Sequence, residues 1–271
     1  MKDFQVIKPS ERLAPYIKQY WFVRLENVLQ ASQRLLPFGC IALTFYRTKP
    51  VNNLSLSSSL SGQTTAYTDI TYSGTIDFVS IIFEPAGAME FFKIPMRELN
   101  NRHIRLNELN DSQILELEKR MCDTHNRQES VNLIEDFLLK RIHNSENQNY
   151  SRMSAVIHSV NNGQKDILEL ADTACFGYKQ FKRIFAENIG INPKDYLRVN
   201  RFQKASHIMQ IRPQTTLTEL ASECNYTDKS HLIRELREFS GYTPTEYKQL
   251  AGPYSEYHYL FRSAFLDSPT S

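Results

Sequence analysis

The side chains with the clearest chemical potential are three cations, Lys179, Lys182 and Arg183, which fall within five residues of one another. If this stretch is helical, Phe181 and Ile184 face inward and the three cations share the opposite side. Such cations can bind phosphate oxygens, and an arginine can also donate two hydrogen bonds to a guanine. An ordinary solvated helix face has the same composition, so these residues alone leave both interpretations open.

A second set of candidate side chains lies further along the chain. It comprises Lys229, Ser230, His231 and Arg234. Asp228, Glu235 and Glu238 offset the positive charge here. Arg234 could also pair with either glutamate and serve structure instead. We therefore expect the first set to carry more of the affinity for a polyanion.

The two sets occupy matching places in an internal duplication of residues 166–196 and 216–247. The matching pairs are Leu170 and Leu220, Phe176 and Tyr226, Arg183 and Arg234, Gly190 and Gly241, and Pro193 and Pro244. The offset is 50 residues in the early pairs and 51 in the later ones, so the second copy contains a single one-residue insertion between Tyr226 and Leu232.

Each copy predicts a short helix, a turn and a longer helix. Asp166 or Thr216 stands three residues before a glutamate, the capping-box spacing that satisfies the first free N–H groups of a helix. The longer helix has an apolar face: Phe181, Ile184 and Phe185 in the first copy, and Leu232, Leu236 and Phe239 in the second. Gly190 or Gly241 ends it, because glycine enters the left-handed cap conformation without strain.

A third helix is expected to follow each copy, because Asn192-Pro193 and Thr243-Pro244 have the cap residue and proline of a helix start. The first of these predicts one long connecting helix, from Lys194 to about Ile211. Short helix, turn and longer helix is the helix-turn-helix plan, in which the second helix enters the major groove. A rigid connector can hold two recognition helices, about residues 178–190 and 228–240, about 34 Å apart, which is one turn of double-stranded DNA.

Over residues 152–250 the sequence resembles the AraC/XylS family of transcription regulators, through LELADTACFGYKQFKRIFAENIGINPKDYLRVNRFQKA and LTELASECNYTDKSHLIRELREFSGYTPTEY. The first half is similar to the N-terminal domain of one branch of that family, through LAPYIKQYWF, LLPFGCIALTFY and SIIFEPAGAMEFFKIPMRELNNRHIRL. The resemblance implies an α+β protein: a cupin-like β-rich N-terminal domain with trailing helices, then an all-α domain of two helix-turn-helix units joined by a long helix. It also implies effector sensing or dimerisation by the first domain and sequence-specific DNA binding by the second, and RNA polymerase becomes an expected partner.

This chain departs from the family pattern at three positions. Cys175 and Asn225 stand in the turns where glycine is usual, and Leu236 stands where phenylalanine is usual. The two turn residues predict slightly strained turns, without casting doubt on the fold.

The first half of the chain has the patterns of strands. Ile41, Leu43 and Phe45 alternate with their neighbours at the period of a half-buried strand. Residues 68–72 and 78–83 predict paired strands around a turn at Ser73-Gly74. The polar residues 49–63 predict a loop.

Two amphipathic helices are predicted after the strands, near residues 114–121 and 131–142, able to pack on the sheet or on another copy of the chain. The polar run 144–149 predicts a linker. The expected domains are therefore residues 1–144 for sensing or dimerisation and 150–250 for DNA binding, with an aromatic tail at 251–271 that packs on a domain or a partner.

Composition bounds the class of protein. The hydrophobic share of 41% and the charged share of 23% are those of a globular protein, and no apolar run approaches the roughly 18 residues of a membrane helix. The N-terminus lacks the apolar region of an export signal, and the four cysteines form no CxxC pair, so reduced core thiols in a cytoplasmic protein are expected. The net charge of +2 neither requires nor excludes nucleic-acid binding.

Small-molecule sites are less clearly marked. Trp21 and Tyr46 are weak candidates for binding an effector, because amphipathic rings suit an apolar pocket, although plain core packing is the commoner role. The seven histidines form no metal-binding group, so no cofactor or metal is expected. The competing hypothesis is a cupin-type enzyme with a helical accessory domain. A homodimer is compatible with the sequence but not required by it.

Overall fold

The computed structural model describes residues 2–48, 57–92, 94–142, 148–163 and 166–250. These residues form two compact units. The first unit comprises the described residues up to Gln33, with Cys40–Gln63 and Ile70–Lys194. The second unit comprises Arg34–Gly39, Thr64–Asp69 and the described residues from Asp195 onward. The predicted tail at 251–271 lies outside the described residues, and the domain division expected from the sequence stays a prediction.

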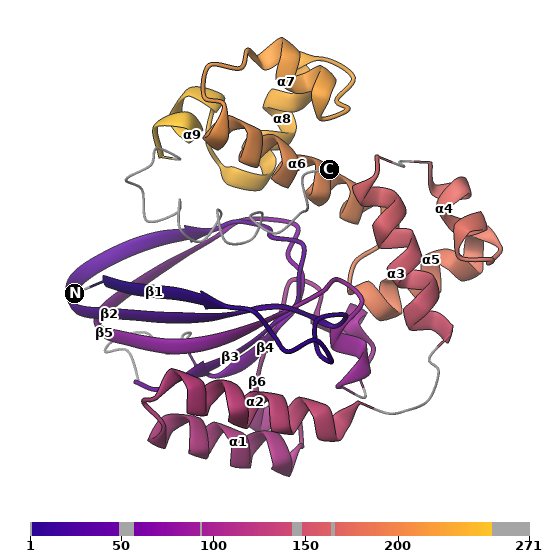
Figure 1. The fold of residues 1–271 in the computed structure, drawn as a ribbon. Coiled ribbons are helices and arrows are strands. Elements are labelled where there is room, and N and C mark those ends of the chain that lie inside the picture. Colours follow the sequence, from indigo (N-terminus) through magenta and orange to yellow (C-terminus); the bar gives the residue numbers. More distant parts are fainter. Residues whose placement is uncertain (1, 49–56, 93, 143–147, 164–165, 251–271) are drawn as a thin grey trace. The chain divides into compact units, whose positions relative to one another are not determined.

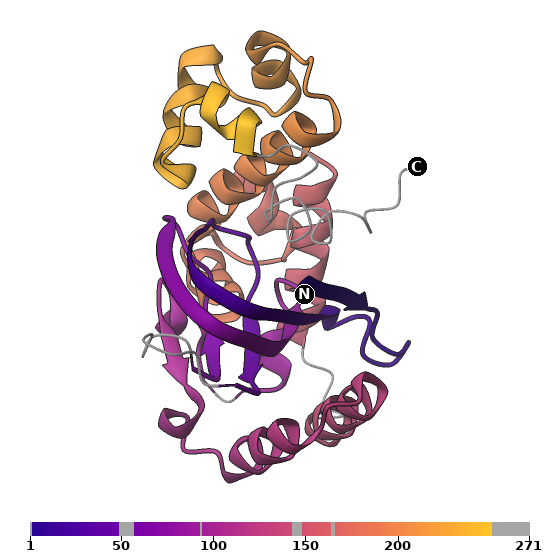
Figure 2. The ribbon, with the colours of Figure 1, turned by 90° about the vertical axis from the view of Figure 1, so that its left-hand side faces the viewer.

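The strands in the first half of the chain form an antiparallel sheet (Figure 1). Its strands are β1 (Lys2–Ile7), β2 (Ile17–Leu35), β3 (Ala42–Tyr46), β4 (Ser59–Ser61), β5 (Thr68–Phe83) and β6 (His103–Arg105). They lie in the order β1-β2-β5-β3-β4-β6. Figure 2 shows that β2 and β5 are long and strongly curved. The β-rich character predicted for this half is confirmed.

Two details of the predicted strands are wrong. β5 runs unbroken through Ser73-Gly74, where a turn was expected. Gly74 has a φ of +85°, and a glycine in this conformation can kink a strand without ending it. Within the predicted loop, Ser59–Ser61 pairs with β3, because backbone hydrogen bonding needs no apolar side chain; residues 49–56 of that loop lie outside the described residues.

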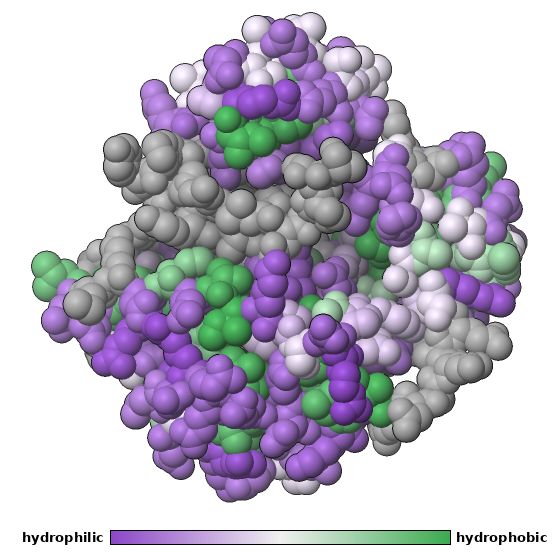
Figure 3. Space-filling view, in the orientation of Figure 1, coloured by the Kyte–Doolittle hydropathy of each residue, from purple (hydrophilic) through white to green (hydrophobic). Residues whose placement is uncertain are grey.

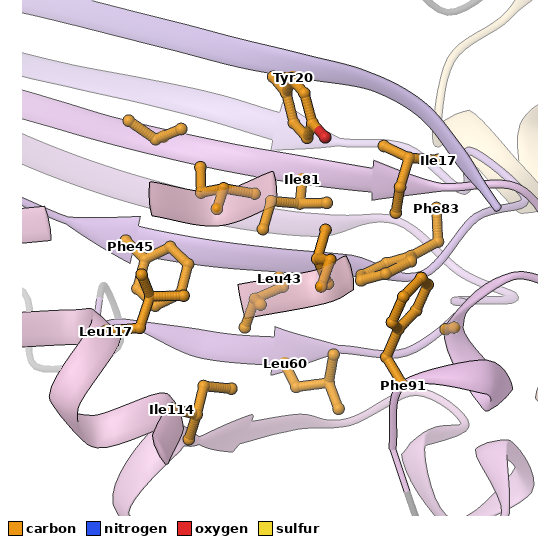
Figure 4. Packing of buried hydrophobic residues seen from close by; sticks show 14 of the residues in the cluster. Ile17, Tyr20, Leu43, Phe45, Leu60, Ile81, Phe83, Phe91, Ile114 and Leu117 are labelled. Carbon is orange, nitrogen blue, oxygen red and sulfur yellow. The ribbon is translucent and has the colours of Figure 1, made fainter. Parts of the chain in front are cut away.

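One face of the sheet packs on two helices, α1 (Ser112–Asp123) and α2 (Arg127–Arg141), which is one of the two arrangements that the sequence left open. Figure 4 shows Ile114 and Leu117 of α1 packed with Leu60 and Phe45 of the sheet. The outer surface of these helices is mainly hydrophilic in Figure 3, as expected for an amphipathic pair. In the described chain, η1 (Ala88–Glu90) and η2 (Met96–Leu99) are short 3-10 helices between β5 and β6, and η3 (Leu106–Glu108) is a third one between β6 and α1.

The second half of the described chain is helical, as predicted. Its helices are α3 (Gln148–Asn161), α4 (Ile167–Thr173), α5 (Tyr178–Ile189), α6 (Pro193–Ile211), α7 (Leu217–Glu223), α8 (Lys229–Ser240) and α9 (Pro244–Leu250). Gln148 and Asn149 belong to α3 rather than to the expected linker, whose other residues 144–147 lie outside the described part. No helix among the described residues has the length and apolar character needed to cross a membrane.

The cysteines divide into two kinds. Cys40 and Cys224 are buried free thiols, as predicted, whereas Cys122 and Cys175 are exposed, which corrects the expectation that all four lie in the core. Cys122 lies in the last turn of α1, and Cys175 lies in the turn between α4 and α5, where no neighbouring element covers its side chain.

Candidate nucleic-acid interface

The first helix-turn-helix unit is formed by α4 and α5. The side chain of Asp166 accepts hydrogen bonds from the N–H groups of Leu168 and Glu169, so it caps α4 as the sequence predicts. Cys175 follows α4 with a φ of +53°, the left-handed conformation that makes the tight turn. Gly190 ends α5 with a φ of +102°.

The three cations of α5 lie where the sequence predicts. Phe181, Ile184 and Phe185 are buried on the inner face of the helix. Lys179, Lys182 and Arg183 are exposed on the other side. The ammonium group of Lys182 lies 5.4 Å from the centre of the Tyr178 ring, and Arg183 forms an ion pair with Glu187 at 3.1 Å. The outer face of α5 therefore offers several cationic donors to solvent within two helical turns.

The C-terminal end of α5 contacts the sheet part of its own unit. Arg97 of η2 forms an ion pair with Glu187 at 2.7 Å. The side-chain amide of Gln63 donates to the carbonyl oxygen of Ile189 at 2.7 Å, away from solvent. A side chain at Gly190 would lie 3.3 Å from the carbonyl oxygen of Met96. These residues were not found from the sequence, because contacts between distant segments leave no spacing pattern.

The second helix-turn-helix unit repeats the plan with α7 and α8. Thr216 and Glu219 form the complete capping box at the start of α7. Asn225 occupies the turn with a φ of +62°, and Gly241 ends α8 with a φ of +73°. Asp228 caps α8 by accepting from the N–H of His231 at 2.8 Å, and this hydrogen bond lowers the pKa of the Asp228 carboxyl. The carboxylate of Asp228 is therefore engaged with the start of the helix.

The predicted polar residues of α8 differ in exposure. Lys229, Ser230 and Arg234 are exposed, whereas His231 is half-buried with its ring edge-on to Tyr226. Arg234 forms no ion pair within the part of the chain that the structure describes. The suggested pairing of Arg234 with Glu235 or Glu238 is therefore wrong.

Both glutamates instead bind arginines of the connecting helix α6. Arg201 contacts Glu235 at 2.6 Å, and Arg198 contacts Glu235 at 2.8 Å and Glu238 at 2.6 Å. Glu235 is almost fully buried, which on its own raises the pKa of its carboxyl; the hydrogen bonds from Arg201 and Arg198 outweigh burial, and the pKa lies below its ordinary value. This network fixes α8 on α6, and Arg234 stays available to a partner.

The weak effector candidates lie on one face of the sheet. Tyr20 and Phe22 of β2 and Phe45 of β3 point into the core, so Trp21 and Tyr46 point to the opposite face. Trp21 packs edge-on against Phe4 with ring centres 6.3 Å apart, and Tyr46 packs on Phe78 at 5.3 Å. Burial raises the pKa of the Tyr46 hydroxyl. Strand β5 lies between their two strands in the sheet.

A hollow of about 370 Å³ lies elsewhere, between α1 and α2, with Leu117, Leu133 and Phe137 in its wall. Neither effector candidate reaches it. Among the described residues no three His, Cys, Asp or Glu side chains gather in a way that could hold a metal ion.

Two stretches of the chain match known protein families. Residues 170–250 match a helix-turn-helix domain, and residues 5–105 match a domain of unknown function (DUF6597). An uncharacterized HTH-type transcriptional regulator of Haemophilus influenzae is 28% identical over 98 residues, 35% of this chain and 33% of that protein. The probable transcriptional regulator LumQ of Photobacterium leiognathi is 28% identical over 82 residues, 30% of this chain and 33% of that protein. The matched part thus spans about a third of the length of each of these relatives.

Solved structures give a looser likeness. A DNA-binding transcriptional dual regulator from Escherichia coli K-12 aligns with a TM-score of 0.34 and 21% identity, over 40% of this chain and 96% of that one. ToxT from Vibrio cholerae aligns with a TM-score of 0.44 and 10% identity, over 86% of this chain and 98% of that one. At these scores the likeness carries no argument about function.

The helical half is a helix-turn-helix domain of the kind found in transcription regulators. This match agrees with the resemblance of the sequence motifs to the AraC/XylS family of transcription regulators.

Proposed function

We propose that the chain is a sequence-specific transcription regulator that binds double-stranded DNA through α5 and α8, in adjacent segments of the major groove. The observation that carries the proposal is the exposed row of Lys179, Lys182 and Arg183 on the outer face of α5, opposite a fully packed inner face. A basic helix of this kind supplies phosphate contacts for affinity and arginine contacts to base edges for specificity.

The second recognition helix supports the same function with fewer charges. Lys229, Ser230 and Arg234 of α8 are exposed, and His231 is half-buried beside them. The 19-residue connector α6 is a continuous helix, about 28 Å long at 1.5 Å per residue. This length suits two helices that read groove segments one turn of DNA apart, about 34 Å. We assign α5 the larger share of the affinity and α8 the role of tuning spacing or contacting RNA polymerase.

The sheet part of the chain is assigned to sensing or dimerisation. Trp21 and Tyr46 remain the residues proposed to contact a small-molecule effector. The function includes no catalysis, no cofactor and no membrane partner, and it is carried out in the cytoplasm. A cupin-type enzyme would need a bound metal, so metal analysis of the purified protein tests that alternative.

The test of the regulator function is the selection of bound fragments from genomic DNA by the purified protein. The experiment uses physiological salt and excess nonspecific competitor, because backbone binding alone is sequence-independent and sensitive to salt. We expect an asymmetric motif with two elements about one helical turn apart, lost in the Arg183→Ala variant. The selection is repeated with metabolite extracts that could supply an effector. If no specific sequence is recovered under either condition, the proposal is contradicted.

A further inference from the structure

Two short segments from the sheet half of the chain belong to the second compact unit. They are Arg34–Gly39, which begins with the last two residues of β2, and Thr64–Asp69, which ends with the first two residues of β5. We call these two segments the β2–β5 extension. Leu36 of the extension is buried in the same hydrophobic cluster as Phe202 and Phe239. The amide of Gln203 on α6 also donates to the carbonyl oxygen of Pro37 at 3.2 Å.

Arg34 makes the most specific contacts of this extension. Its Nε and Nη2 atoms donate to the two carboxylate oxygens of Asp69 at 2.6 and 2.7 Å. Its Nη1 atom donates to the carbonyl oxygen of Ser240 at 3.1 Å. Its guanidinium carbon lies 4.0 Å from the centre of the Tyr67 ring and 4.6 Å from that of Tyr242. The guanidinium group is thus fixed by a carboxylate, a backbone oxygen and two aromatic rings.

The contact falls at the C-terminal end of the second recognition helix. Ser240 is the last residue of α8, and its carbonyl oxygen is one of those that have no partner inside a helix. A cation at this end also interacts favourably with the helix dipole. The chain then turns at Gly241, where an added Cβ atom would lie 2.4 Å from Nη1 of Arg34 and 2.9 Å from the Tyr67 ring. Glycine is needed here both for its φ of +73° and for the space that Arg34 occupies.

An exposed ion pair alone would add little, because such pairs are screened by solvent. Asp69 is about half exposed, but the Arg34 side chain is only 18% exposed. Planar stacking and the fixed fork of donors make arginine geometrically specific in a way that lysine is not. The arrangement therefore contributes more to the orientation of the end of α8 than to the free energy of folding.

We propose that Arg34 is a positioning residue for DNA reading by α8. The β2–β5 extension fixes the C-terminal end of α8, and the side chains that face DNA lie on the earlier turns of the same rigid helix. A small tilt about the C-terminal end would displace Lys229 and Ser230 the most, since they lie furthest from it. This inference rests on the proposed function, and it makes DNA reading by α8 dependent on a residue of the sheet half.

The test is hydroxyl-radical footprinting of the full-length chain on the fragment that the wild-type protein selects. For Arg34→Ala we expect protection of the α8 half of the site to need at least tenfold more protein, while the α5 half changes less than twofold. The matched control is Arg24→Ala, which removes another arginine of β2, one that pairs with Glu26 and Asp77 instead. The control should leave both halves unchanged.

Arg34→Lys keeps the charge but loses the fork and the stacking, so it should weaken the α8 half in the same direction. It also serves as the test variant if thermal melts show that Arg34→Ala does not fold. Equal weakening of both halves, unchanged protection or tighter binding would each overturn the proposal. A wild-type protein that protects no specific sequence would instead refute the proposed function itself, so the two failures are distinguishable.

Discussion

Arg183 donates from Nη1 to both carboxylate oxygens of Glu187, at 3.2 and 3.1 Å, one turn further along α5. The same carboxylate binds Arg97 of η2 at 2.7 Å. Arg183, which we propose contacts DNA, is thus held by Glu187. The same glutamate connects α5 to the sheet part of the unit. Glu187 lowers the positive charge of the surface that DNA would approach, and it restricts the directions in which Arg183 can point.

Replacing Glu187 with glutamine should therefore tighten DNA binding. The change removes one negative charge close to the face proposed to bind phosphates, and it releases Arg183 from its ion pair. We expect a gain of roughly threefold at moderate salt, equivalent to about 0.7 kcal/mol. Titrations of the selected fragment measure it, with Glu129→Gln on α2 as a control of equal charge change. Weaker binding by Glu187→Gln would show that the carboxylate positions Arg183 productively.

Substitutions of the exposed cations on α5 and on α8 should weaken DNA binding to different degrees. Lys182→Ala should lower affinity about equally for all sequences and reduce the salt slope by about one. Arg183→Ala should in addition lose about 1–3 kcal/mol of base discrimination. Arg234→Ala on α8 should have the smaller effect, because α8 is less basic. Equal losses and equal slopes for Arg183→Ala and Arg234→Ala would contradict the assignment of most of the affinity to α5.

Acid should weaken the packing of α8 on α6 through Glu235. The folded pKa of this carboxyl is below its unfolded value of about 4.3, so its contribution is complete above that pH and is lost as pH falls through the folded pKa. Glu235→Gln should cost about 2–3 kcal/mol at neutral pH, less than a fully buried pair because both arginines reach solvent. Denaturant unfolding between pH 7 and 3 should show the gap between wild type and variant closing below about pH 4. A gap that stays constant would exclude Glu235 as the titrating group.

Local features of the helix-turn-helix units were predictable from the sequence. Capping by Asp166 and Thr216 and the left-handed ends at Gly190 and Gly241 depend on neighbours within a few residues, so spacing reveals them. The turn predicted at Ser73-Gly74 was wrong because that prediction, too, used only neighbouring residues. Glycine with positive φ marks turns most often, but pairing with neighbouring strands extends β5 across it.

Contacts between distant segments were not predictable in the same way. Arg34 and Ser240 are 206 residues apart, and both are common surface residue types with no distinctive pattern. Glu235 did carry a signal that was missed. It stands three residues after Leu232 and four before Phe239, so it borders the core face of α8 and needs a cationic partner. Arg198 and Arg201, three residues apart on the connector, were the available cations.

The four thiols should react in two classes. Cys122 and Cys175 are exposed and should be modified quickly by a thiol reagent at pH 8. Burial raises the pKa of Cys40 and of Cys224 to about 11, so these two should react only on unfolding. Because Cys175 lies in the turn just before α5, the selected DNA fragment should protect Cys175 and leave Cys122 reactive. Mass mapping of the modified peptides checks both expectations, and equal protection of the two would count against α5 as the groove-facing helix.

A substitution in the turn at Cys175 should also stabilise the folded protein. A non-glycine residue in the left-handed region costs about 1 kcal/mol or more, whereas asparagine tolerates it better. Cys175→Gly removes that strain, against roughly 0.5 kcal/mol of added chain entropy in the unfolded state. We therefore expect Cys175→Gly to raise the Tm by about 1–2 °C, whereas Asn225→Gly changes it little. Cys175→Ala is the matched control, because it removes the exposed thiol but keeps the Cβ atom that causes the strain. If Cys175→Ala stabilises the protein as much as Cys175→Gly, the gain comes from the thiol and the backbone of this turn is unstrained.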